Sequence, residues 1–107
     1  MQFRVIEKGA YGTAETPKSA VTVTKGDKES TIRLDLGMRP TGGWSIEPLS
    51  VSAEGGVVTV TAKVNAPPGG SIVTQAFTAP FAVIAVNAKP AAVRWVDESG
   101  NLIAEWK

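Results

Sequence analysis

Short segments in which apolar and polar residues alternate are the feature that most constrains this chain. In residues 58–64 every second residue is Val or Ala, and Thr or Lys stands between them. The same period of two recurs in residues 21–24 and 31–36, and it indicates strands with one buried face. Such strands, separated by turn residues about every 8–12 positions, are typical of sandwiches and barrels. We predict an all-β fold: an antiparallel β sandwich, with an immunoglobulin-like arrangement as one version and a small β barrel as the alternative.

Two other segments predict details of this fold. Residues 81–86 are apolar at both parities, which is typical of a central strand that is covered on both sides. In residues 44–53 the apolar positions change parity around Pro48, and a bulge there would return both sets to the core. The final segments, 93–96 and 102–106, should form a hairpin. Residues 10–19 read as a loop, with Tyr11 folded back onto the core.

The length and net charge of the chain are those of an ordinary globular protein. Its 107 residues predict a single domain, residues 1–107, and a net charge of +1 gives no general attraction to nucleic acid or anionic membranes. No apolar run approaches the roughly 20 residues that span a bilayer, so we expect no membrane insertion. The first residues show no signal-peptide pattern. This leaves two alternatives: a cytoplasmic protein by default, or an exported one whose leader has been removed.

The chain has few of the residue types that commonly carry out catalysis. The chain has no His and no Cys, so it cannot build the usual Ser–His or Cys–His pairs or the common zinc sites. Asp27, Glu29, Asp97 and Glu98 fall in predicted turns, where solvated surface charge is the ordinary reading. We therefore predict no enzymatic activity, no cofactor and no metal site.

Two loops rich in Pro and Gly, residues 39–44 and 66–70, say more about function. Pro stiffens a loop and so lowers the entropy lost on binding, and Trp and Arg are frequent binding anchors. Loops at one end of a β sandwich lie close together, so the two segments should be neighbours. The predicted partner-binding residues are Arg39, Pro40, Thr41, Gly42, Gly43, Trp44, Pro67, Pro68 and Gly69.

These motifs resemble a known family. The run Gly37-Met38-Arg39-Pro40-Thr41-Gly42-Gly43-Trp44-Ser45-Ile46, then Pro67-Pro68-Gly69, then Gln75-Ala76-Phe77-Thr78-Ala79-Pro80-Phe81, is similar to the pattern of the PrcB C-terminal domain family. Trp44 and Phe81 stand where that pattern usually has tyrosine. The resemblance covers roughly residues 32–86. It implies a non-catalytic bacterial domain, whose namesake accompanies a surface protease complex and supports its assembly or stability.

A looser similarity is to chagasin-type cysteine-protease inhibitors, which present three loops at one end of an immunoglobulin-like sandwich. The counterparts here would be residues 39–44, 67–70 and 79–81, although the first departs from the inhibitor motif at Arg39 and Gly42 and the third lacks its Arg.

Three hypotheses about function follow. The first is a non-catalytic domain that binds a protein partner, a protease in particular, and stabilises or inhibits it through the Pro/Gly loops. The alternative is a structural or self-associating β module without a protease partner. The last is a binder of small ligands or oligosaccharides that uses Trp44.

Overall fold

The computed structural model describes residues 2–67 and 77–107. This part of the chain is all-β, and no helix in it is long and apolar enough to cross a membrane. Its strands are β1 Phe3–Gly9, β2 Ala20–Lys25, β3 Ser30–Asp35, β4 Ser45–Glu54, β5 Val57–Asn65, β6 Phe81–Val86, β7 Ala92–Val96 and β8 Leu102–Trp106.

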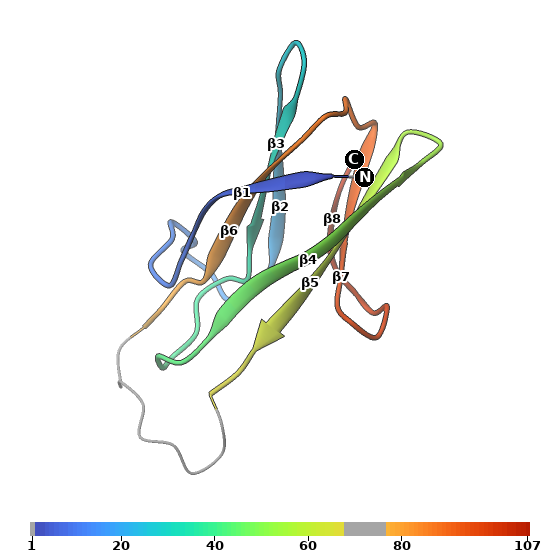
Figure 1. Cartoon of the computed structure of the whole chain (residues 1–107). Coiled ribbons are helices and arrows are strands. Elements are labelled where there is room, and N and C mark those ends of the chain that lie inside the picture. Colours follow the sequence, from blue (N-terminus) through green and yellow to red (C-terminus); the bar gives the residue numbers. More distant parts are fainter. Residues whose placement is uncertain (1, 68–76) are drawn as a thin grey trace.

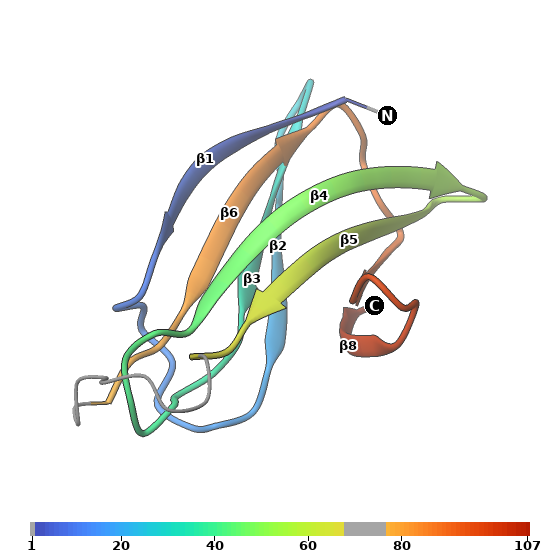
Figure 2. The same ribbon diagram turned by 60° about the horizontal axis from the view of Figure 1, so that its bottom comes forward.

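The strands form two four-stranded sheets, in the orders β1-β6-β3-β2 and β4-β5-β7-β8. Figures 1 and 2 show the sheets as two layers, with the long β4–β5 hairpin on one side of the molecule. The sandwich prediction is confirmed, and the described strands do not close into a barrel. One pair departs from the antiparallel expectation, because β5 and β7 run parallel.

The inner faces of the sheets supply the core. Ile32 and Leu34 from β3 meet Val58 and Val60 from β5, and Trp95 of β7 is fully buried among them. The alternation in residues 31–36 and 58–64 therefore predicted the buried faces correctly.

Strand β6 lies inside the first sheet and is covered on both sides, as its apolar sequence predicts. Ala82, Ile84 and Val86 face the core. The ring of Phe81 belongs to the other face, where the guanidinium of Arg33 lies 4.5 Å from its centroid.

The predicted bulge in β4 is present. Pro48 pairs with Ala62, but the next pair is Ser50 with Thr61, so Leu49 has no partner opposite it. The extra residue restores the parity, and Ile46 and Val51 are both buried on the core side.

The expectation for Tyr11 is wrong. Its side chain is 77% exposed, although its main chain forms an isolated parallel bridge with Ala79. Residues 10–12 run beside Ala79, just before β6, and this bridge holds the main chain while the ring is exposed to solvent.

Candidate functional site

The loop between β3 and β4 contains most of the predicted binding residues, and it is bound to the segment before β6. Arg39 N–H donates to the Thr78 carbonyl at 2.8 Å, and Thr78 N–H donates to the Arg39 carbonyl at 2.9 Å. The buried Thr78 hydroxyl donates to the Thr41 carbonyl at 2.8 Å. Two sequence motifs that lie far apart in the chain therefore form one hydrogen-bonded unit.

A second segment, residues 12–17, braces this unit from outside. Met38 N–H donates to the Thr16 carbonyl at 2.8 Å, and Arg39 Nη1 donates to the Pro17 carbonyl at 3.0 Å. Gly12 N–H donates to the Ala79 carbonyl at 2.7 Å. The β3–β4 loop is consequently held by main-chain bonds from two directions.

Gly37 is required for this close packing. Its φ is +95°, a conformation that residues with a side chain rarely adopt, and a Cβ there would lie 2.6 Å from the Pro17 carbonyl group. Gly43 also has a positive φ, of 84°. The glycines of this loop thus allow a sharp turn and a close main-chain approach.

Arg39 and Trp44 pack on each other within the loop. The guanidinium carbon lies 5.3 Å from the centroid of the indole, which suits a cation–π contact. Trp44 is half-buried and packs against the core, while Pro40 and Gly43 are exposed. The two predicted anchors, Arg39 and Trp44, therefore also have partners inside the domain.

The second predicted loop is described only in part. Asn65, at the end of β5, pairs with Ser45, the residue after Trp44, and its amide donates to the Ser45 hydroxyl at 3.2 Å. Pro67 follows two residues later and is half-buried. Pro68 and Gly69 lie outside the described residues.

Sequence reasoning missed an exposed apolar surface beside this loop. Tyr11 is 77% exposed and Phe77 is 68% exposed, and both line a hollow of about 170 Å³ together with Met38. We call Tyr11, Met38 and Phe77 the apolar rim. Tyr11 could have been found in the sequence as an aromatic residue surrounded by polar and small ones; Phe77 has no comparable signal, because it adjoins an apolar strand.

Two larger hollows flank the loop. One, of about 300 Å³, is lined by Trp44, Ile46, Lys8 and Glu47. The other, of about 350 Å³, lies on the side of Arg39 and is lined by Leu36, Val64 and Asp97 among others. The hydrogen bond from the Asn101 main chain holds the pKa of Asp97 below its ordinary value of 3.8, so this carboxylate is charged at neutral pH.

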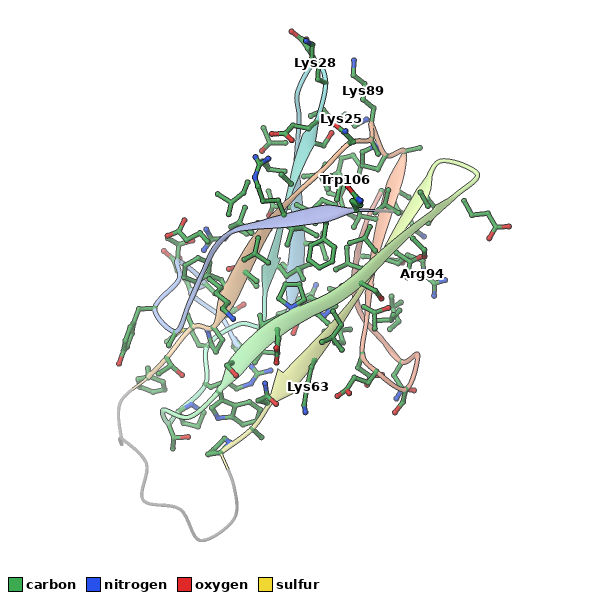
Figure 3. The ribbon with its side chains drawn as sticks, in the orientation of Figure 1. Lys25, Lys28, Lys63, Lys89, Arg94 and Trp106 are labelled. Atoms are coloured by element: carbon green, nitrogen blue, oxygen red, sulfur yellow. The ribbon has the colours of Figure 1, made fainter. Side chains whose placement is uncertain are left out.

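The charged residues in the described part of the chain are spread over its surface. Within residues 2–67 and 77–107, no three His, Cys, Asp or Glu side chains are placed to hold a metal ion. Figure 3 shows Lys25, Lys28 and Lys89 near the tip of the β2–β3 hairpin, at the opposite end of the molecule from the β3–β4 loop. Lys25 Nζ lies 5.3 Å from the ring centroid of Trp106.

Comparison with protein families gives a match to the PrcB C-terminal family model over residues 32–87, which is more than half of the chain. The chain belongs to the PrcB C-terminal family. No curated protein and no solved structure is similar enough to this chain to count as a match.

The segment matched by the PrcB C-terminal model contains both halves of the hydrogen-bonded unit. It includes the β3–β4 loop and Thr78, together with strands β4, β5 and β6 and most of β3. Residues 12–17, which brace the loop, and Tyr11 lie before it. Residues outside the matched segment thus support its β3–β4 loop.

Proposed function

We propose that this PrcB C-terminal domain is a non-catalytic module that binds a protein partner, a protease or a component of its complex, through the apolar rim and the adjoining β3–β4 loop. The exposed pair Tyr11 and Phe77, next to the loop of the family motif, is the observation that carries this proposal.

Exposure of two large aromatic side chains costs solubility without stabilising the fold, so such a pair is more often found where a surface binds something. Tyr is also among the residue types enriched in binding hot spots. The Met38 side chain, flexible and polarizable, lines the hollow between the two rings and can adapt to an inserted group.

Rigidity of the supporting main chain favours the same function. The bonds that Arg39, Thr78 and Gly12 make fix the loop and both flanks of the rim before any partner arrives. A surface that is already ordered loses little conformational entropy on association, so more of the contact energy contributes to affinity.

Family membership points to a protease complex as the partner class. Association that supports the protease fits this surface better than inhibition through the loop. Arg39 is held by carbonyl groups of its own chain and by the Trp44 ring, and it does not extend from the loop tip.

A structural or self-associating module is the second candidate. It is favoured by the number of motif groups that have partners within the domain, among them the Thr78 hydroxyl and the Arg39 guanidinium. In that case the motif would specify the fold of the loop, and the rim would have no heterologous partner.

The test is affinity capture from a lysate of the source cells, with the wild-type domain and a Tyr11→Ser/Phe77→Ser double variant as baits. Captured proteins are identified by mass spectrometry. We expect the wild type to retain a peptidase or a subunit of its complex, and we expect the double variant to lose at least about 90% of it, because two anchors are removed. The thermal unfolding midpoint of the double variant should remain near that of the wild type.

Leu102→Ser provides the matched control, because Leu102 is an exposed apolar residue of β8, outside the rim. It should capture the same proteins as the wild type. Equal capture by the rim variant, or the absence of any peptidase component from the wild-type sample, would contradict the proposal.

A further inference from the structure

The outer strands of the two sheets contact each other in pairs across the sandwich, β1 with β4 and β2 with β8. Between β2 and β8, Lys25 stacks on Trp106. β4 contains Pro48, which has no N–H to offer a further strand. β1 has no proline, pairs only with β6 among the described strands, and exposes 42% of Val5 and 49% of Ile6.

A bulge in β1 places two opposite charges on the same face. Arg4 pairs with Ala85 and Glu7 pairs with Val83, while Ile6 has no partner. Ala85 and Val83 lie on the side of β6 away from the core, because Ala82, Ile84 and Val86 face the core. Cross-strand partners share a face. Arg4 and Glu7 are therefore both on the outer face, whereas in a regular strand residues three apart lie on opposite faces.

The same register places Phe3 and Lys8 together on the inner face, because their partners are Val86 and Ala82. Because of the bulge, Arg4 and Glu7 share the outer face of β1, and Phe3 and Lys8 share the inner face. Both pairs lie symmetrically about the peptide bond between Val5 and Ile6. This is the condition for an antiparallel pairing of β1 with a copy of itself around a twofold axis.

We propose that two copies of this chain associate through β1, antiparallel and centred between Val5 and Ile6, so that the sheets join across the twofold axis. Arg4 then lies opposite Glu7 of the partner subunit, and Phe3 lies opposite Lys8 of the partner subunit. The exposed side chains of Val5 and Ile6 are covered at the axis.

Charge complementarity selects this register. It places two opposite-charge pairs on the outer face, and each stabilises an antiparallel ladder. A shift of one residue would place Arg4 opposite Lys8, which are like charges on different faces. In the single chain Arg4 Nη2 donates to Glu29 Oε1 at 3.1 Å; this ion pair is exposed to solvent, so the guanidinium is accessible to a second carboxylate.

The proposal does not rest on the proposed function, because β1 lies outside the apolar rim. It is tested by sedimentation velocity of the isolated chain over a wide range of concentrations. We expect a concentration-dependent dimer, and we expect Arg4→Glu and Glu7→Arg each to weaken it by about tenfold or more, since each creates two like-charge contacts. The double variant Arg4→Glu/Glu7→Arg should restore dimerisation to near the wild-type level.

Glu29→Gln is the control for the ion pair within the chain, and it should leave the dimer intact. The chain has no cysteine, so the register can also be read by cross-linking. An oxidised mixture of Val5→Cys and Ile6→Cys chains should give the linked heterodimer, and Leu102→Cys should give none. A monomer at every concentration, or a dimer that the single charge variants do not weaken, would overturn the proposal. So would a failure of the double variant to recover.

Discussion

Arg39 and Thr78 exchange both of their main-chain hydrogen bonds, at 2.8 and 2.9 Å, and so join the β3–β4 loop to the segment that leads into β6. This isolated bridge connects two strands of the first sheet beyond the ends of their regular pairing. Each of the two segments therefore satisfies main-chain polar groups of the other.

Among the side-chain groups of this connection, the Thr78 hydroxyl should contribute most to the free energy of unfolding. Thr78→Val keeps the shape but leaves the Thr41 carbonyl without its donor, so we expect a loss of about 1–2 kcal/mol in the free energy of unfolding. Urea denaturation measures this loss. Thr78→Ser retains the hydroxyl and should be clearly more stable than the valine variant; equal midpoints for the two would contradict the assignment.

Gly37 and Gly55 form a matched pair for testing the close approach of the loop to residue 17. Both have positive φ, but a Cβ at Gly37 meets the Pro17 main chain at 2.6 Å, whereas a Cβ at Gly55 meets nothing within 4 Å. We expect Gly55→Ala to cost about 1 kcal/mol and Gly37→Ala about 3 kcal/mol or more in stability. Similar losses for both variants, measured by urea denaturation, would show that the packing against residue 17 contributes nothing.

Arg39 and Trp44 should be energetically coupled. A double-mutant cycle of Arg39→Ala and Trp44→Ala should give a coupling energy of about 0.5–1 kcal/mol, because the guanidinium stacks on the indole 5.3 Å away. Chemical denaturation of the four proteins supplies the cycle. Strictly additive effects would mean that the two side chains support the loop independently.

Asp97 should make the β7–β8 turn sensitive to acid. Main-chain N–H groups of Asn101 and Ser99 donate to its carboxylate, and these bonds hold its pKa below the ordinary value of 3.8. A pKa lowered by folding contributes stability above the unfolded pKa, and that contribution is lost as the pH falls through the folded pKa. The difference in urea midpoint between wild type and Asp97→Asn should therefore be constant near neutral pH and shrink below about pH 4. A difference that does not change with pH would contradict this role.

Much of the fold could be predicted from local patterns, because a period of two is a direct consequence of strand geometry. The alternation in residues 31–36 and 58–64 gave the buried faces, and the change of parity around Pro48 gave the bulge. The parallel pairing of β5 with β7 could not be predicted in the same way, because a strand shows the same alternation whichever direction its neighbour runs.

The candidate site was less accessible to sequence reasoning. The Pro and Gly residues of the β3–β4 loop predict its position from the sequence. The hydrogen bond from the Thr78 hydroxyl to the Thr41 carbonyl could not be predicted, because only the tertiary structure brings these groups together. Tyr11 was misplaced because a lone aromatic residue in a polar loop normally packs inward to leave water. Here the main-chain bridge to Ala79 fixes the segment, and the ring remains outside.

The parallel β5–β7 pair also bears on how the chain folds. Between these two strands the polypeptide passes through β6, an inner strand of the opposite layer, so the β5–β7 pairing closes a long loop that contains a strand of the other sheet. Such long-range closures slow folding. Refolding should therefore be a slow, all-or-none event in which both layers appear together, and no half of the sandwich should persist alone.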